Sequence, residues 1–168
     1  MSSKTRGHYF RHGAVDFKNS EAIMTWKEVE IEIRKKFKKR WKRWYAHSPI
    51  RVYVDIDTAD LLEWGHFLIE KVSARFITAS AMDTPRNEIE ILYHFAFYGL
   101  PQVLSLRVCV PKEKLEIESM ARILKGAEWI EREMAELFGI RFIGHPNPKR
   151  LLLPEDWPEG KYPLRRDP

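Results

Sequence analysis

The stretch EIEILYHFAFYGLPQVLSLRVCV, residues 88–110, contains two alternating segments separated by a short break. In the first segment, the odd-numbered positions from Ile89 to Phe97 are all apolar, which is the period of a strand with one buried face. The break YGLP carries Gly and Pro, which are typical of a turn. The second segment alternates in the same way. Residues 88–110 therefore predict two neighbouring strands that turn back on each other.

Upstream of this pair, the chain alternates again and then changes period. IRVYVDID, residues 50–57, predicts a strand with Val52, Val54 and Ile56 on one side. A helix is expected over residues 61–72, then a strand near residues 75–81 that ends in the turn MDTPRN. A strand, a helix and a strand form a crossover, and the later turns add a meander. The predicted fold class is α/β (α+β), with a mixed four-stranded sheet and helices packed on one face.

The N-terminal segment predicts an amphipathic helix, because its apolar residues recur at steps of three and four. The apolar stripe consists of Trp26, Val29, Ile33, Phe37, Trp41 and Trp44. Thr25 is a candidate N-cap, and Glu28 completes a capping box. We expect a basic helix over residues 25–46, preceded by a flexible arm over residues 1–24.

This helix carries most of the chain's net positive charge. RKKFKKRWKR, residues 34–43, holds eight positive charges and no negative one, whereas the whole chain sums to +5. Such a surface suits nucleic acid, an anionic membrane surface or a partner protein. The candidate binding residues are Lys35, Lys36, Lys38, Lys39, Arg40, Lys42 and Arg43.

Beyond Pro111 the sequence predicts two more helices. A short apolar stripe from Ile117 to Leu124 indicates the first, and residues 127–138 indicate the second, with Gly139 at its left-handed C-terminal cap. In the second helix, Glu128, Arg132 and Glu136 stand four apart, which predicts an ion-pair ladder. The final segment, residues 144–168, contains six of the ten prolines and cannot continue as a helix.

The proline-rich segment also carries three leucines and a tryptophan in LLLPEDW, residues 151–157. Apolar side chains exposed on a segment without a core of its own need a cover. We expect an extended tail that docks on another chain. Trp129, on the polar side of the preceding helix, is a further candidate for partner contact.

Composition limits the possible chemistry. A chain of 168 residues with 44% apolar content suits one domain. The single Cys109 excludes an internal disulfide and a cluster held by this chain's own thiolates. His8 and His12 lack enough nearby ligands for a zinc site, so no metal is expected. No apolar run is long enough for a signal peptide or a membrane span.

The C-terminal sequence EREMAELFGIRFIGHPNPKRLLLPEDW, residues 131–157, followed by YPLRRDP, resembles the signature of the 30-kilodalton subunit of respiratory complex I. The motif comprises Glu131-Arg132-Glu133, the acidic Glu136, His145 and Lys149-Arg150 at the family's spacing, and then Pro163-Leu164-Arg165. The resemblance covers roughly residues 50–168. The chain departs from the common HPDLRR pattern at Pro148 and Lys149.

The resemblance implies a subunit without a cofactor, held in a multi-subunit complex on the cytoplasmic side of the membrane. In the family, this subunit packs against a large subunit that forms the quinone site or holds a nickel–iron centre. Iron–sulfur clusters are expected in partner subunits, including a small iron–sulfur subunit; membrane subunits are indirect partners. The short tail and a composition with one Gln and three Asn, typical of hot environments, favour a membrane-bound hydrogenase or a related archaeal-type reductase. The alternative within the family is a subunit of an NADH, ferredoxin or F420H2:quinone-type complex or of a sulfur-reducing complex.

The interface candidates follow from the motif and from the apolar side chains around it. They are Trp129, Glu131, Arg132, Glu133, Glu136, His145, Lys149, Arg150, Trp157, Pro163, Leu164 and Arg165. Given the resemblance, we expect the basic helix to meet a partner protein or membrane headgroups, and we expect no nucleic acid. Two alternatives from other classes are a free-standing nucleic-acid-binding protein that uses the basic helix and a soluble enzyme that uses Glu131 and Glu133. Neither a nucleophile–base pair nor a ligand cluster is visible, so we expect a scaffold without catalytic residues.

Overall fold

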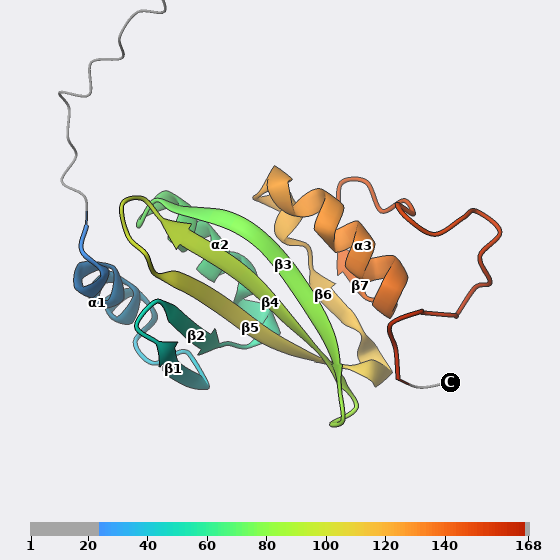
Figure 1. The fold of residues 1–168 in the computed structure, drawn as a ribbon, viewed down its shortest axis with the longest axis horizontal. Helices are drawn as coiled ribbons and strands as arrows, with labels where there is room; N and C mark the ends of the chain where they lie inside the picture. Colours follow the sequence, from blue (N-terminus) through green and yellow to red (C-terminus); the bar gives the residue numbers. More distant parts are fainter. Residues whose placement is uncertain (1–23, 167–168) are drawn as a thin grey trace, which may run out of the picture.

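The fold is built on a five-stranded mixed sheet (Figure 1). The computed structural model describes residues 24–166, so the expected arm over residues 1–24 falls almost wholly outside the described residues, as do His8 and His12. The strands are β1 (Arg43–Ser48), β2 (Arg51–Asp55), β3 (Ala74–Thr84), β4 (Glu88–Phe97) and β5 (Val103–Pro111).

The strand order is β1-β2-β5-β4-β3. β2 and β5 are parallel, and the other neighbouring pairs are antiparallel. The chain therefore leaves β2, crosses through helix α2 (Leu61–Glu70) to β3 at the far edge, and returns through β4 to β5. This topology confirms the predicted crossover and meander. The alternation in residues 88–110 is also confirmed, because Ile91, Tyr93 and Phe95 are fully buried.

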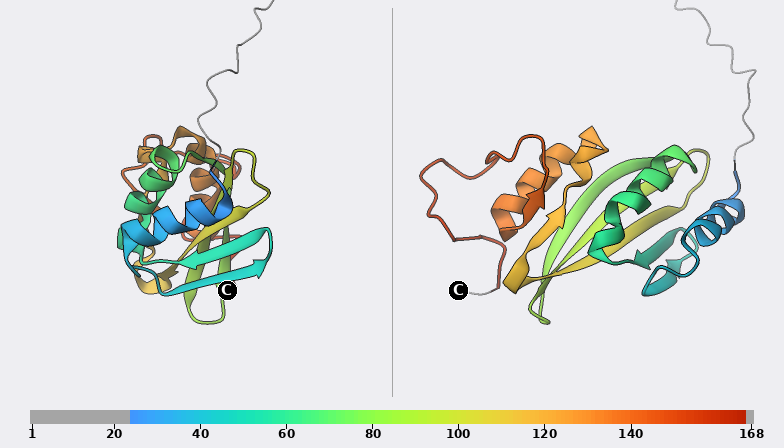
Figure 2. Two further views of the ribbon diagram at one scale, coloured as in Figure 1. Left: turned by 90° about the vertical axis from the view of Figure 1, so that its left-hand side faces the viewer. Right: turned by 180° about the vertical axis from the view of Figure 1, so that it is seen from behind.

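The helices cover the face of the sheet that these residues occupy. Helix α1 (Trp26–Phe37) and α2 pack on this face, as Figure 2 shows from behind. Phe37 of α1 stacks on Trp64 of α2 with ring centroids 3.8 Å apart. The predicted capping box at Thr25 is formed, since its backbone N–H and hydroxyl both reach Glu28.

The sheet has one more strand than predicted, because the basic helix is shorter than residues 25–46. α1 ends at Phe37, since Lys38 and Lys39 adopt left-handed conformations with φ of 44° and 71°. The chain then reverses and forms β1. Trp41 and Trp44 continue the helical spacing, but they contact each other from the turn and the strand. The helical spacing of apolar residues from Trp26 to Trp44 therefore arises from helix α1 together with the turn and strand β1 that follow it.

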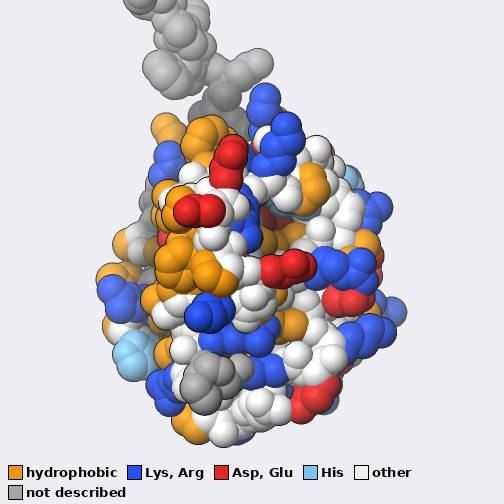
Figure 3. All heavy atoms as spheres, turned by 90° about the vertical axis from the view of Figure 1, so that its right-hand side faces the viewer, with side chains coloured by type: hydrophobic (Ala, Val, Ile, Leu, Met, Phe, Trp, Pro, Cys, Tyr) orange, Lys and Arg blue, Asp and Glu red, His pale blue; other side chains and the backbone are white. Residues whose placement is uncertain are grey.

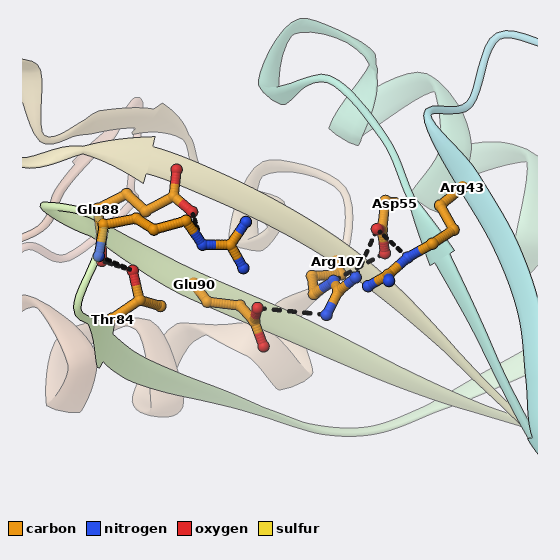
Figure 4. A network of polar contacts seen from close by, with 7 residues as sticks. Arg43, Asp55, Thr84, Glu88, Glu90 and Arg107 are labelled. Carbon is orange, nitrogen blue, oxygen red and sulfur yellow. Dashed lines mark hydrogen bonds and ion pairs between the residues drawn. The ribbon is translucent and has the colours of Figure 1, made fainter.

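The opposite face of the sheet is uncovered by helices and carries a network of charged side chains (Figure 4). Arg107 Nε donates to Asp55 Oδ1 at 2.7 Å, and its NH1 lies 3.3 Å from Glu90 Oε2. Arg43 Nε donates to Asp55 Oδ2 at 3.0 Å. Burial raises the pKa of both Asp55 and Glu90. The contacts run in series from Arg43 through Asp55 and Arg107 to Glu90, so they connect β1, β2, β5 and β4.

The region after β5 differs from the prediction of two helices. It contains the 3-10 turns η2 (Lys112–Lys114), η3 (Met120–Arg122) and η4 (Lys125–Ala127), strand β6 (Glu116–Glu118), helix α3 (Glu128–Phe138) and strand β7 (Arg141–Ile143). β6 pairs with β7 in parallel. The expected helix over residues 117–124 is wrong, because the backbone N–H groups at its middle bind the side chain of Glu131. Gly139 caps α3 with φ of 76°, as predicted.

Candidate functional site

The site begins at Glu131, whose side chain lies on the buried side of α3 and has no exposed surface. Tyr93 Oη donates to Glu131 Oε1 at 2.9 Å, and Ser119 Oγ donates to Oε2 at 2.5 Å. The backbone N–H of Met120 donates to Oε1 at 2.8 Å. Glu131 thus fixes α3 to β4 and to η3. The backbone N–H groups of Met120 and Ala121 donate to this carboxylate and not to the carbonyls four residues earlier, which explains why the expected helix is not formed.

Burial shapes the acid–base behaviour of this group. Desolvation raises the pKa of Glu131, and the hydrogen bonds from Ser119, Tyr93 and the backbone oppose that rise. Burial also raises the pKa of Tyr93 well above its ordinary value. Sequence reasoning missed Tyr93 and Ser119 as partners. One feature of the sequence pointed to such partners: Glu131 lies beside the apolar face of the helix. A carboxylate buried at that position requires hydrogen-bond donors from other parts of the chain.

His145 is a hydrogen-bonded turn residue, as expected from the sequence. Its Nδ1 accepts the Asn147 N–H at 3.0 Å, so that nitrogen carries no proton, and Nε2 donates to the Glu128 carbonyl at 3.0 Å. Nε2 lies 4.0 Å from Glu131 Oε2, and the His145 side chain is 2% exposed. His145 and Glu131 were both expected at an interface, but their side chains contact the interior of this chain.

Two other side chains of α3 hold the start of the tail, residues 144–166. Arg132 Nε donates to the Lys149 carbonyl at 2.7 Å, and its NH2 donates to the Arg150 carbonyl at 2.6 Å. The Glu136 carboxylate accepts the backbone N–H groups of residues 151, 152 and 153 at 3.1, 2.6 and 3.1 Å. The expected ladder of Glu128, Arg132 and Glu136 is not formed, because the last two bind the tail backbone.

The end of the tail returns to the same helix. The Leu164 N–H donates to the Leu137 carbonyl at 3.1 Å, and Arg165 Nε donates to the Phe138 carbonyl at 2.7 Å. At Gly139 a Cβ atom would approach the Tyr162 ring to 2.5 Å. Glycine therefore serves both the left-handed cap and the close passage of the tail.

Between these two attachments, residues 154–161 form an arch that stands away from the domain (Figure 1). Arg150 closes the arch by donating to the carbonyls of Pro154, Glu155 and Trp157 at 2.9, 3.2 and 3.1 Å. Trp157 Nε1 donates to the Lys161 carbonyl at 2.9 Å. The arch, α3 and β7 enclose an open pocket of about 370 Å³, which we call the arch pocket.

The remaining interface candidates differ in exposure. The ring of Trp129 is prominent on the surface, with 65% of the residue exposed, and Leu164 is 52% exposed. Lys149, Arg150 and Pro163 are also exposed, whereas Arg132, Glu133, Trp157 and Arg165 are partly buried. The tail is not simply extended as expected: both of its ends are bound to α3. Its role at an interface stays a prediction.

The basic segment, residues 34–43, is largely paired within the domain. Each of six of its eight cations has a carboxylate of residues 24–166 within 4.0 Å, and only Lys38 and Lys39 lack one. The pairs are Arg34–Glu30, Lys35–Glu32, Lys36–Glu63, Arg40–Asp60, Lys42–Asp57 and Arg43–Asp55. Arg34 also lies over the Trp44 ring at 4.2 Å. The charge run is therefore much less available to an anionic partner than its sequence indicates.

Metal clusters and membrane-spanning helices are both absent from the described part of the chain. Within residues 24–166, no cluster of three or more His, Cys, Asp or Glu side chains is arranged to hold a metal ion. None of the helices in this range has both the length and the apolar character needed to cross a membrane. Burial raises the pKa of the Cys109 thiol to about 11, which keeps it protonated at neutral pH.

Solved structures share this fold. One is described as the membrane-bound sulfane sulfur reductase, an archaeal respiratory membrane complex; a chain of it matches with a TM-score of 0.73 and 21% identity, over 84% of each chain. Another is a trypsin-resistant fragment of Nqo5, with a TM-score of 0.60 and 20% identity, over 71% of this chain and 98% of the fragment. At these identities the likeness concerns the fold alone.

Sequence relatives are subunits of oxidoreductases. One subunit of the F(420)H(2) dehydrogenase of Methanosarcina mazei is 41% identical over 124 residues, which are 71% of this chain and 77% of that protein. One subunit of the NADH-quinone oxidoreductase of Ruegeria pomeroyi is 34% identical over 119 residues, 68% of this chain and 58% of that protein. The chain spans about half the length of related NAD(P)H-quinone oxidoreductase subunits from Prochlorococcus marinus.

The family match extends from the second strand to the C-terminus. The model of the respiratory-chain NADH dehydrogenase 30 Kd subunit matches residues 54–168, which include the end of β2, the buried Glu131 cluster and the whole tail. This confirms the resemblance drawn from the ERE motif. The chain belongs to the family of the 30-kilodalton subunit of the respiratory-chain NADH dehydrogenase.

Proposed function

We propose that this chain is a scaffold subunit in the hydrophilic arm of a membrane-bound, ion-pumping redox complex, on the cytoplasmic side. It docks on the large catalytic subunit and on the small iron–sulfur subunit and holds them in register for electron transfer. The large subunit either forms a quinone site or holds a nickel–iron centre, and the iron–sulfur clusters belong to partner subunits. The family match and the naming of its relatives as subunits support membership of such a complex.

The tail is the observation that supports docking most directly. Both of its ends are fixed to α3 by hydrogen bonds, yet the side chain of Leu152 in the first attached segment is left exposed, with 61% of the residue accessible. Trp129 and Leu164 are exposed on the same helix and tail. Apolar side chains held in place but uncovered are typical of a surface that a partner buries.

The chemistry of the motif's acidic groups favours a structural role. The Glu131 carboxylate is fully buried and bonded to donors of its own chain, so it offers no free oxygen to a substrate. Glu136 is occupied by three backbone N–H groups. Both carboxylates accept hydrogen bonds that hold the backbone of this chain in place. This structural use agrees with a scaffold subunit that holds its neighbouring subunits in position.

Among the possible complexes, the relatives favour a dehydrogenase or reductase type. The Methanosarcina mazei protein, a subunit of an F(420)H(2) dehydrogenase, matches over most of both chains. This supports the F(420)H(2) or NADH type of partner, with a quinone-site large subunit, over the membrane-bound hydrogenase. The basic segment supports nucleic-acid binding only weakly, because six of its cations already have carboxylate partners.

Removal of the tail tests the proposal. A tagged chain that ends at Ile143, before Gly144, keeps the sheet, α3 and β7. We expect it to fold, as measured by circular dichroism, but to lose co-purification with the large subunit from detergent-solubilised membranes. The tagged full-length chain is the control and should bring down the large and the iron–sulfur subunits, identified by mass spectrometry. Retention of the large subunit by the folded, truncated chain would contradict the docking role.

A further inference from the structure

The arch pocket combines cationic side chains that have no ion-pair partner in the described chain. Its lining includes Arg132, Lys149, Arg150 and Lys161, and none of these four forms an ion pair with a carboxylate of residues 24–166. Among the described residues, the guanidinium groups of Arg132 and Arg150 donate hydrogen bonds only to backbone carbonyls, which carry no net charge to balance them. The pocket therefore presents positive charge to whatever enters it.

The carboxylates that line the same pocket, Glu131, Glu136 and Glu159, offset this charge only in part, because the lining holds five Lys and Arg side chains. Glu131 and Glu136 are bound by donors of their own chain, namely side-chain hydroxyls and backbone N–H groups. Glu159, on the exposed side of the arch, is the remaining carboxylate among the lining residues. Arg141 adds a further cation to the wall, although it is paired with Glu116. The balance inside the pocket is cationic.

Apolar surface lies directly beside these charges. Leu153, Trp157 and Tyr162 contribute to the lining, and Leu152 and Leu164 are exposed on the tail that frames it. On this face of the molecule, Lys and Arg side chains gather next to a hydrophobic patch (Figure 3). A small inorganic anion would meet the charges but leave the apolar surface in water. A peptide segment that carries both carboxylates and apolar side chains would satisfy both.

We propose that the arch pocket receives an acidic segment of a neighbouring protein subunit, whose carboxylates bind Lys149, Lys161 and Arg132 while its apolar side chains cover Trp157 and the tail leucines. This inference rests on the proposed function and names the chemistry of the partner at that site. A volume of about 370 Å³ suits a few side chains of such a segment. Charge complementarity here sets the orientation of docking and the rate of association.

Zero-length crosslinking of the native complex tests the inference. A carbodiimide joins a lysine amine to a carboxylate only where the two are in contact. In the intact complex that contains the full chain, we expect Lys149 or Lys161 to be joined to an Asp or Glu of another subunit, as read by mass spectrometry. Links confined to the tail's own Glu155, Asp156 or Glu159, links to lipid, or no links would each overturn the inference.

A matched pair of variants measures the strength of the contact. Lys149→Gln with Lys161→Gln removes two charges from the pocket and leaves the arch's hydrogen bonds intact. Lys114→Gln with Lys125→Gln, at exposed positions outside the pocket, is the control with the same net charge. We expect the first pair to weaken retention in the complex by about tenfold at moderate salt, and the control to retain wild-type behaviour.

The outcomes separate the two proposals. A full-length wild-type chain that brings down no other subunit contradicts the proposed function itself. If the wild-type chain assembles and the Lys149→Gln/Lys161→Gln chain resists salt equally well, the proposed function stands and the acidic partner segment is wrong. Equal weakening by the control pair would also overturn the inference, because the effect would then follow net charge and not the pocket.

Discussion

The basic segment, residues 34–43, and the tail, residues 144–166, are both rich in cations, but the fold treats their charges differently. In the basic segment, the cations meet carboxylates at the surface, such as Lys36 with Glu63 at 2.8 Å. In the tail region, Arg132 and Arg150 hold backbone carbonyls, and the tail lysines have no carboxylate partner among the described residues. Both segments are rich in Lys and Arg in the sequence, but the tail region leaves more of its positive charge without a carboxylate partner among the described residues.

The carboxylates of the two regions differ in the same way. Glu63 is 42% exposed and binds two cations, Lys36 and Arg40, across water-exposed contacts. Glu131 and Glu136 are buried and accept hydrogen bonds from neutral donors, mostly backbone N–H groups. Surface ion pairs contribute little to stability, whereas buried donors that lose their acceptor cost much more. Positive charge in a sequence is therefore informative only once its partners are known.

The largest predicted difference between the regions is in global stability. Glu131→Ala strips the acceptor from Tyr93, Ser119 and the Met120 N–H, so we expect the free energy of unfolding to fall by about 3 kcal/mol or more. The matched change Glu63→Ala in the partner helix of the basic segment should lower it by less than about 1 kcal/mol, because that ion pair is exposed. Urea denaturation followed by circular dichroism measures both. Equal losses would refute the contrast drawn between the two regions.

A smaller, local effect is expected where the tail is attached. Glu136→Ala removes the acceptor of the three backbone N–H groups that begin at Leu151, so the tail should open while the sheet stays folded. We expect the opening free energy of these amides to drop by about 2 kcal/mol, which is roughly a 30-fold faster hydrogen exchange. Amides of β4 serve as the internal control. Unchanged exchange at residues 151–153 would show that Glu136 does not hold the tail.

The sequence predicted the parts of the fold that depend on local periodicity. The alternation of β4 and β5, the capping box at Thr25 and the Gly139 cap were all correct, because each depends on neighbouring residues. The end of α1 was wrong, since Trp41 and Trp44 keep helical spacing from a turn and a strand. The spacing of apolar residues alone does not reveal that the chain changes direction at Lys38.

The sequence predicted which residues of α3 belong to the candidate site, but it did not predict which groups they bind. The ERE motif identified Glu131, Arg132 and Glu136, yet their partners lie far away in sequence, for example Tyr93, 38 residues from Glu131. A helical wheel predicts pairs within α3, such as Arg132 with Glu136. The tail supplies stronger partners, because backbone groups of a proline-rich segment lack partners of their own.

The two regions should also respond to pH with opposite signs. The folded pKa of Glu131 is raised above 4.5, so between 4.5 and that value the folded chain holds more protons than the unfolded chain, and stability falls as pH rises. The pKa of Glu63 is lowered by hydrogen bonds from Lys36 and Arg40, so its contribution is present above 4.5 and is lost as pH falls.

Substitutions isolate the two signs. Glu131→Gln should remove a negative slope of unfolding free energy against pH above 4.5, and Glu63→Gln should remove a positive slope below it. Asp55 and Glu90 add to the negative slope in every variant, because burial raises the pKa of both. Urea denaturation at several pH values on both sides of 4.5 provides the measurement. Slopes that change in the same direction would show that burial does not govern Glu131.

The smallest effect concerns the anion affinity of the basic segment. Asp60→Asn with Glu63→Gln releases Lys36 and Arg40 from their partners, so retention on a double-stranded DNA column should rise, with the salt dependence steeper by about one unit per freed cation. Glu113→Gln with Glu155→Gln changes the net charge equally at residues that form no ion pair within residues 24–166, and should leave retention near the wild-type value. Strong retention of the wild-type chain would mean that its surface pairs do not neutralise the segment. In that case the contrast with the tail fails, because both regions would then offer their cations to a partner.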